Sequence, residues 1–248
     1  PVTEWLGKSL WSNRMLEMLK DLHQEIDVAS EIKEKGWGNA SREEVNGDLL
    51  QVLSRMYWMT GDQEFLDWAI VIGDYYLLGD HHPTKNLTYL RLRDHGCELI
   101  SGLCELYAAV NVARPDKKAA YQKPLTEVLD RILEVGRNKD GLFYDGINPQ
   151  TGEITHPRIA DNWGYTLNGF YTVYLIDKNP AYKDAVLKVF SNLKAYRNFD
   201  WENGSADGYA DAIEGALNLY NRIPDPKVAQ WIDSEIDVMW AKQQEDGI

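Results

Sequence analysis

Residues 161–196, DNWGYTLNGFYTVYLIDKNPAYKDAVLKVFSNLKAY, contain two apolar-periodic segments that are separated by a short turn. The first segment ends at Tyr174, and the turn IDKNPA leads into a second segment that begins near Tyr182. Asn, Asp and Pro between two helical patterns are typical of a turn that joins antiparallel helices. This stretch therefore predicts an αα-hairpin.

The same unit recurs along the chain. Each of four tyrosines ends an apolar-periodic segment and is followed by a short turn and a second amphipathic segment; they are Tyr57, Tyr107, Tyr174 and Tyr220. A further helix, roughly Ser9 to Lys35, precedes the first hairpin. The sequence therefore predicts four helical hairpins and one unpaired helix.

The connections between hairpins are longer than the turns within them. They cover 36–43, 79–93, 137–160 and 198–206, and the third one contains a β-hairpin pattern with Asn-Pro-Gln-Thr-Gly at its turn. If the hairpins stack side by side, all these connections lie on one rim. Binding and catalytic residues are common on such loops over a rigid scaffold.

Polar residues recur on one face of the first helix of each hairpin. Positions spaced by four and then three residues share a helix face, and this spacing before the tyrosines gives three rows: Glu44, Asp94, Asp161 and Asp207; Asp48, Glu98, Tyr165 and Asp211; Gln51, Ser101, Asn168 and Glu214. An unpaired charge costs several kcal/mol when it is buried. The rows therefore predict that the four helices line a shared, water-filled cavity.

Helix capping is an alternative explanation for the first row, because acids are preferred at helix starts. Capping does not explain the polar residues that follow four and seven positions later. Three glycines on the same helices, Gly102, Gly169 and Gly215, are expected to permit close helix approach.

These hairpins, turns such as Met-Thr-Gly-Asp at 59–62 and the acids at the helix starts resemble the α/α toroid superfamily, which includes six-hairpin glycosidases, several polysaccharide lyases and sugar epimerases. The segments DNWGY (161–165) and DGYADAIEG (207–215) look like glycan-site segments of such enzymes. The resemblance implies an all-α toroid of helical hairpins that forms a single domain over 1–248, with a small β-hairpin in one rim loop. Members usually have six hairpins, so we expect an incomplete or truncated ring, or part of a longer chain.

The first functional hypothesis is a glycoside hydrolase, which needs two carboxyl groups that flank the glycosidic bond. The candidate catalytic residues are Asp94, Asp161, Asp207 and Asp211. The aromatic candidates for stacking on sugar rings are Trp37, Trp163, Trp201 and Tyr209, and Arg93 is a candidate for holding a uronate carboxylate. The remaining candidate substrate contacts are Asp48, Glu98, Tyr165, Asn168 and Glu214.

Two other hypotheses remain open. A polysaccharide lyase would use a His or Tyr base, for which His95, Tyr165 and Tyr209 are the right types, with Arg93 and Arg158 to neutralise a uronate. A sugar epimerase would use similar histidines. A helical domain that binds glycans without catalysis is the third reading.

Composition excludes some partners. The chain carries 9 Trp and 14 Tyr against 5 Phe, which suits a wet binding surface. Its net charge of −13 disfavours nucleic acid and anionic membranes. No metal or cofactor is expected, because His81, His82 and His95 lack a tight ligand spacing and no phosphate-cradling Gly-rich loop is present. The sequence predicts neither the oligomeric state nor the particular glycan.

The two cysteines, Cys97 and Cys104, lie seven residues apart in a predicted helix, where a disulfide cannot form, so free thiols are expected. The chain opens at Pro1 rather than Met, which fits the removal of a leader. A periplasmic or secreted location is slightly favoured over a cytoplasmic one.

Overall fold

The computed structural model describes residues 7, 9–25, 35 and 41–242. The helices are α2 (Leu10–Glu25), α4 (Arg42–Thr60), α5 (Gln63–Leu77), α6 (Cys97–Ala113), α7 (Pro115–Val135), α8 (Trp163–Asp177), α9 (Pro180–Asn192), α10 (Ala206–Arg222) and α11 (Pro226–Lys242), with 3-10 turns η2 (Leu193–Tyr196) and η3 (Trp201–Gly204). The pairs α4–α5, α6–α7, α8–α9 and α10–α11 are the four predicted hairpins. No helix in the described part of the chain is both long and apolar enough to span a bilayer.

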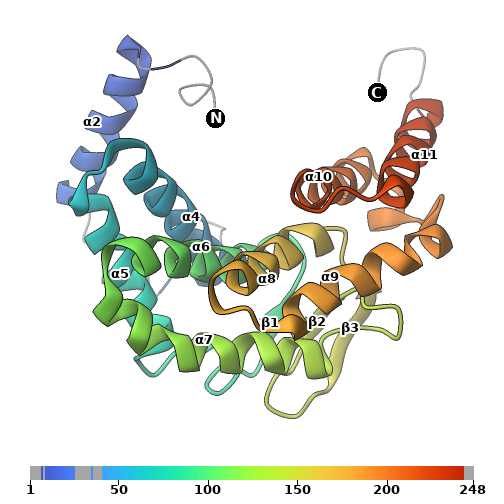
Figure 1. Cartoon of the computed structure of the whole chain (residues 1–248), viewed down its shortest axis with the longest axis horizontal. Helices are drawn as coiled ribbons and strands as arrows, with labels where there is room; N and C mark the ends of the chain where they lie inside the picture. Colours follow the sequence, from blue (N-terminus) through green and yellow to red (C-terminus); the bar gives the residue numbers. More distant parts are fainter. Residues whose placement is uncertain (1–6, 8, 26–34, 36–40, 243–248) are drawn as a thin grey trace.

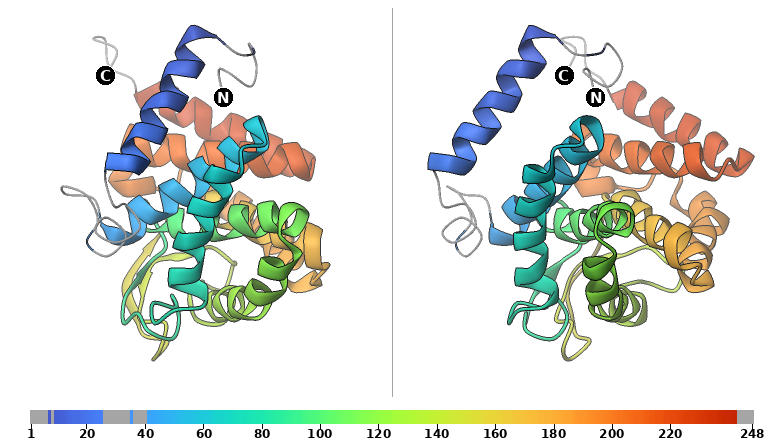
Figure 2. Two further views of the ribbon diagram at one scale, coloured as in Figure 1. Left: turned by 90° about the vertical axis from the view of Figure 1, so that its left-hand side faces the viewer. Right: turned by 60° about the vertical axis from the view of Figure 1, so that its left-hand side comes forward.

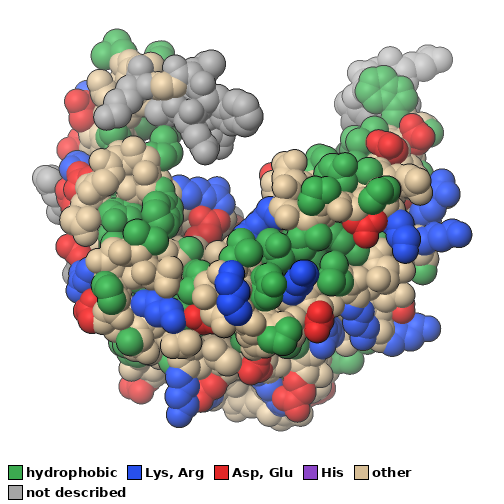
Figure 3. Space-filling model, viewed as in Figure 1, with side chains coloured by type: hydrophobic (Ala, Val, Ile, Leu, Met, Phe, Trp, Pro, Cys, Tyr) green, Lys and Arg blue, Asp and Glu red, His purple; other side chains and the backbone are tan. Residues whose placement is uncertain are grey.

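The hairpins form two layers. The first helices of the four hairpins pack against one another in chain order, α4 on α6, α6 on α8 and α8 on α10, and each second helix packs on its own partner. Figure 1 shows the resulting open arc, with α5, α7, α9 and α11 on its outside. Figure 3 shows the surface hollowed between the two ends of this arc, with acidic and basic side chains in the hollow.

Glycines bring the inner helices unusually close together. A Cβ on Gly164 of α8 would lie 2.4 Å from the Cα of Gly215 on α10. A Cβ on Gly102 of α6 would lie 2.6 Å from the carbonyl oxygen of Gly47 on α4. Gly169 faces a side chain instead, the Sγ of Cys104 at 3.1 Å. The predicted packing role of these glycines is confirmed.

Three aromatic residues that the sequence predicts to stack on sugars are instead buried in the core between the layers. Trp163 and Trp201 are fully buried and make edge contacts with Trp231 of α11, at centroid distances of 6.0 and 6.2 Å. The ring of Tyr209 is also buried, and its hydroxyl donates to the Phe199 carbonyl at 2.7 Å. Because these rings face the outer layer, no sugar can reach them, and this part of the prediction is corrected. Trp37 lies outside the described residues.

A small antiparallel sheet lies at the side of the molecule where α4 begins (Figure 2). It consists of β1 (Leu90–Arg91), β2 (Tyr144–Ile147) and β3 (Ile154–Ile159), in that order. The β2–β3 pair is the predicted hairpin, whose turn is closed by Asn148 Oδ1 accepting from two backbone N–H groups, those of Gln150 and Thr151. The strand β1 was not predicted, because two residues are too short to show a period.

The predicted N-terminal helix is present as α2, and residues 26–34 lie outside the described part. The helix packs on α5, where His23 stacks on Trp68 at 4.2 Å and Lys20 forms an ion pair with Asp62 at 2.6 Å. Both cysteines are buried free thiols, as predicted.

Candidate active site

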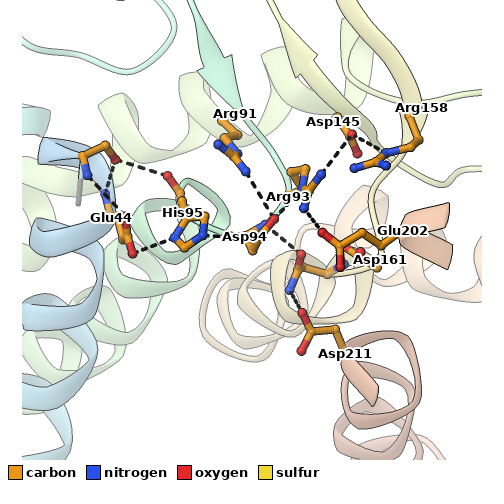
Figure 4. Close-up of polar contacts among 12 residues, drawn as sticks. Glu44, Arg91, Arg93, Asp94, His95, Asp145, Arg158, Asp161, Glu202 and Asp211 are labelled. Carbon is orange, nitrogen blue, oxygen red and sulfur yellow. Dashed lines mark hydrogen bonds and ion pairs between the residues drawn. The ribbon is translucent and has the colours of Figure 1, made fainter. Parts of the chain in front are cut away.

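The N-terminal ends of the four inner helices meet on one rim and are linked by hydrogen bonds (Figure 4). Ser41, the N-cap of α4, donates to the His95 carbonyl at 3.2 Å, immediately before α6. The backbone N–H of Asp94 donates to Oδ1 of Asn162, the N-cap of α8, at 2.7 Å. The side chain of Asn162 in turn donates to Oδ2 of Asp211 on α10 at 2.7 Å. The described parts of the long connections therefore meet on one rim, as the sequence predicted, while residues 36–40 of the first connection lie outside the described part of the chain.

Asn162 joins two of the predicted catalytic acids. Its backbone N–H donates to Oδ1 of Asp161 at 3.0 Å, while its Nδ2 holds Oδ2 of Asp211. Within the described part of the chain, the other oxygen of each carboxyl group forms no hydrogen bond. Asn162 is not among the predicted site residues. Its position directly after Asp161 is the feature of the sequence that could have indicated a role in the site.

The two acids differ from free carboxyl groups in their pKa. Burial raises the pKa of Asp161 to about 6; the charge of Arg93 opposes this shift, and the charges of Glu202 and Asp211 add to it. Burial also raises the pKa of Asp211, against the hydrogen bond from Asn162 and with the charge of Asp207. Neighbouring carboxylates add to the effect of burial on both residues, so the protonated form of each acid is favoured relative to a free carboxyl group.

Asp94 has the opposite character. Its burial is outweighed by the hydrogen bond and charge of Arg93, so its pKa is lowered. Oδ1 of Asp94 contacts Arg93 and, at 3.4 Å, Arg91, while its Oδ2 lies 3.1 Å from His95 Nε2. Because both oxygens have cationic partners, Asp94 is suited to hold the site together and has no oxygen left to accept a proton.

Capping accounts for Glu44 but not for Asp94 or Asp161. The residues at the N-cap positions of α6 and α8 are Gly96 and Asn162, one position or more after Asp94 and Asp161. Glu44 does belong to a capping box with Ser41, and Asp207 lies exposed in the first turn of α10. Catalysis by Asp207 therefore remains a prediction.

His95 is clamped between two carboxylates. Its Nδ1 lies 2.7 Å from Glu44 Oε1, and this hydrogen bond raises the pKa of His95 against the effect of burial, with further help from Asp94. The residue has a left-handed backbone, with φ of 63°. Such a conformation is costly for a residue with a Cβ and is often retained at functional sites. A protonated imidazole in this position is an acid or a cationic contact rather than a base.

Arg93 connects the rim to the loop before α10. Its guanidinium contacts Glu202 in η3 and approaches Asp145 of β2 at 3.8 Å. Glu202 has a left-handed backbone, with φ of 44°. Asp145 and Glu202 were not predicted as site residues, because the sheet and the η3 turn bring them in from separate loops.

The deeper polar rows are used partly for packing between the inner helices. Tyr165 donates to Glu214 Oε2 at 2.6 Å, and Ser101 donates to the Tyr165 carbonyl at 3.2 Å. Burial, with the bond to Glu214, raises the pKa of Tyr165. Asn168 donates to the Gly164 carbonyl of its own helix at 2.9 Å, as a packing group would.

Two further acids lie side by side on α4 and α6. Burial raises the pKa of Glu98, and the charge of Asp48 adds to this shift. Burial raises the pKa of Asp48 as well, with a contribution from Glu44. Asp48 is exposed, whereas Glu98 is half-buried, so solvent reaches this pair from the Asp48 side.

Together, the two helical layers and the rim define an α/α toroid-type fold. A solved D-mannose isomerase superposes with a TM-score of 0.58 at 16% sequence identity, over 81% of this chain and 59% of that one. A glycoside hydrolase of family 76, a mannosidase from Bacteroides thetaiotaomicron, superposes with a TM-score of 0.55 at 16% identity, over 82% of this chain and 62% of that one. This chain thus spans about three fifths of each enzyme, and identity at this level supports the fold alone.

No family model matches the sequence, and no curated protein matches it.

Proposed function

We propose that this chain is a carbohydrate-active enzyme, most specifically a glycoside hydrolase that uses Asp161 and Asp211. The observation that carries the proposal is the arrangement around Asn162. One asparagine holds one oxygen of each carboxyl group and leaves the other oxygen without a hydrogen bond in the described structure. Two carboxyl groups on one rim, one directly before the N-cap of α8 and one on α10, are the minimal equipment for glycosidic cleavage.

The two residues would take complementary roles. Asp161, with its pKa of about 6, donates a proton to the glycosidic oxygen as the bond to the anomeric carbon breaks. Asp211 accepts a proton from the water that attacks this carbon. Asp94 stays ionised and fixes Arg93 beside the acid. The leaving sugar gains one proton, the water loses one, and a second turnover requires only proton exchange with solvent.

The alternatives with a His or Tyr base have less support. The pKa of His95 is raised by its hydrogen bond to Glu44, and the pKa of Tyr165 is raised by burial, so both shifts disfavour the deprotonated form that a base requires. A sugar isomerase is the second candidate, because one of the structural neighbours is a mannose isomerase. It would have to use His95 after deprotonation, and its activity would then rise with pH.

Mannosides and mannose are the first substrates to test, because the two neighbours are a mannosidase and a mannose isomerase. The assay would follow new reducing ends from mannosides and uronate-containing oligosaccharides, conversion of mannose to a ketose, and ultraviolet absorbance of an unsaturated sugar. The hydrolase proposal expects reducing ends without unsaturation.

The variants Asp161→Asn and Asp211→Asn should each lower turnover by at least about 100-fold. Asp184→Asn, an exposed acid on the outer helix α9, is the matched control and should retain activity. Wild-type turnover in both rim variants would refute the assignment, and ketose formation alone would favour the isomerase.

A further inference from the structure

A cationic depression lies next to the proposed acid pair. It has a volume of about 430 Å³ and is lined by Tyr89, Arg91, Arg93, Asp145, His156, Pro157 and Arg158. Asp145 is the one carboxylate among these lining residues. Three guanidinium groups in one depression are unusual on a chain whose net charge is −13.

The sheet explains why the cationic side chains gather there. Alternate residues of a strand point to opposite faces. Leu90 and Leu92 are buried in the core, so Tyr89, Arg91 and Arg93 share the other face. In the register of the sheet, Arg91 pairs with Gly146, which in turn pairs with His156.

Gly146 has no side chain, which leaves room for the depression on this face of the sheet. A Cβ at this position would lie 2.8 Å from the ring of Tyr89 and 3.0 Å from Nδ1 of His156. Tyr89 and His156 meet edge to face above it, with centroids 5.7 Å apart. The two rings therefore form one wall of the depression, and Arg91 and Arg158 flank it.

The guanidinium groups have hydrogen-bond donors to spare. Arg158 uses its Nε on Asp145 at 2.9 Å, and within the described residues Arg91 makes a single long polar contact, with Asp94 at 3.4 Å. Each guanidinium carries five N–H donors in a planar fork. Arg93 is different, since Asp94 and Glu202 engage it and its side chain is 15% exposed. Arg91 and Arg158 thus present free donors to the depression, and Arg93 forms its inner wall.

We infer that this depression binds an anionic substituent on the sugar substrate, a carboxylate, sulfate or phosphate group, through Arg91 and Arg158. Planar guanidinium forks bind such oxyanions with two parallel hydrogen bonds. Because Arg93 contacts both the depression and Asp94, the anion would fix the sugar with its glycosidic bond near Asp161. This inference rests on the proposed function and narrows it to charged glycans.

The test uses calorimetric binding to the Asp161→Asn protein, which the proposed function expects to bind without turnover. The probes are a mannobiose and its three counterparts with a carboxylate, a sulfate or a phosphate on the same carbon. At least one charged probe should bind about 10-fold tighter or more than the neutral disaccharide, and the preference should shrink as salt is added. Which charged probe gains most identifies the substituent.

Arg91→Met and Arg158→Met should each abolish most of this preference. Arg114→Met is the matched control, because this arginine has a similarly exposed side chain (35%, against 34% for Arg91 and 32% for Arg158) but pairs with Asp67 on the outer layer. Circular dichroism would check that the variants fold.

Equal binding of charged and neutral probes, or loss of preference in the Arg114 variant as well, would overturn the inference. So would the absence of binding to all four probes. Failure of the hydrolase proposal looks different: wild-type protein would bind the charged probe in an arginine-dependent manner but release no reducing sugar. Cleavage of neutral mannosides without any charge preference would retain the hydrolase and reject the anion site.

Discussion

Burial of Asp161 has opposite consequences for catalysis and for stability. Its folded-state pKa of about 6 lies above the ordinary value of 3.8. Above pH 6 the residue is ionised in both the folded and the unfolded state, and burial penalises only the folded one. As the pH falls from 6 toward 3.8, the folded state takes up a proton first, so this penalty disappears.

Asp161→Asn is therefore expected to stabilise the protein while it inactivates the enzyme. At about pH 7.5 the free energy of unfolding should rise by about 1–3 kcal/mol, and the gain should shrink as the pH approaches about 4. Urea denaturation at several pH values measures this directly. If the variant were less stable than the wild-type protein at neutral pH, the interactions of the Asp161 carboxylate would outweigh the cost of burying its charge.

Asn162 is the residue on which the rim depends most. Asn162→Ala removes the acceptor for the Asp94 N–H and the donor to Asp211. Groups left without a partner after burial cost about 1–3 kcal/mol. We expect a loss of stability of that order and a fall in turnover of about 10-fold or more, measured by denaturation and by the reducing-end assay. Unchanged turnover in the folded variant would show that Asn162 is not needed for catalysis.

At the scale of the elements, the contact between α8 and α10 sets how closely Asp161, which directly precedes the N-cap of α8, approaches Asp211 on α10. Gly164→Ala would place a methyl group 2.4 Å from backbone atoms of Gly215, which cannot move independently of their helix. We expect a loss of about 1–3 kcal/mol in unfolding free energy, measured in urea. Gly169→Ala is the control in the same helix, because its neighbour is the Cys104 side chain at 3.1 Å, and it should cost less. Equal costs would contradict this reading of the glycines.

The helical hairpins were predictable because their signal is local. A period of 3.6 residues, turn residues and the β-hairpin turn at 148–152 are all written in contiguous sequence. The burial of Trp163 and Trp201 against α11 could not be predicted from local sequence. Periodicity shows which residues share a face, but only packing shows that this face lies toward α11 and not toward the hollow.

The candidate site was predictable in part for the same reason. Asp94 and Asp161 stand at the starts of predicted helices, and Asp211 stands one turn after the acid that starts its helix, so the sequence could group them near one rim. Asp145 and Glu202 reach Arg93 only through the sheet and the η3 turn. Contacts between residues this far apart in sequence leave no periodic trace in a single chain.

For the whole molecule, the open arc points the N-terminal ends of α4, α6, α8 and α10 toward one rim. The partial positive charge at a helix N-terminus favours nearby carboxylates. This arrangement allows several acids to gather in one place on a strongly acidic chain. The rim, where these acids gather, is therefore where chemistry is expected.

The pH dependence of kcat/KM for hydrolysis tests the central claim most directly, because it reports the protonation states that turnover requires. With Asp161 as the proton donor, activity should fall as the pH rises through about 6 and should also fall at low pH, where Asp211 becomes protonated. The Asp161→Asn protein should lack hydrolytic activity across the pH range, including the decline above about pH 6 that the wild-type protein is expected to show. Activity that keeps rising through neutral pH, or a wild-type profile in the Asp161→Asn protein, would contradict the assignment.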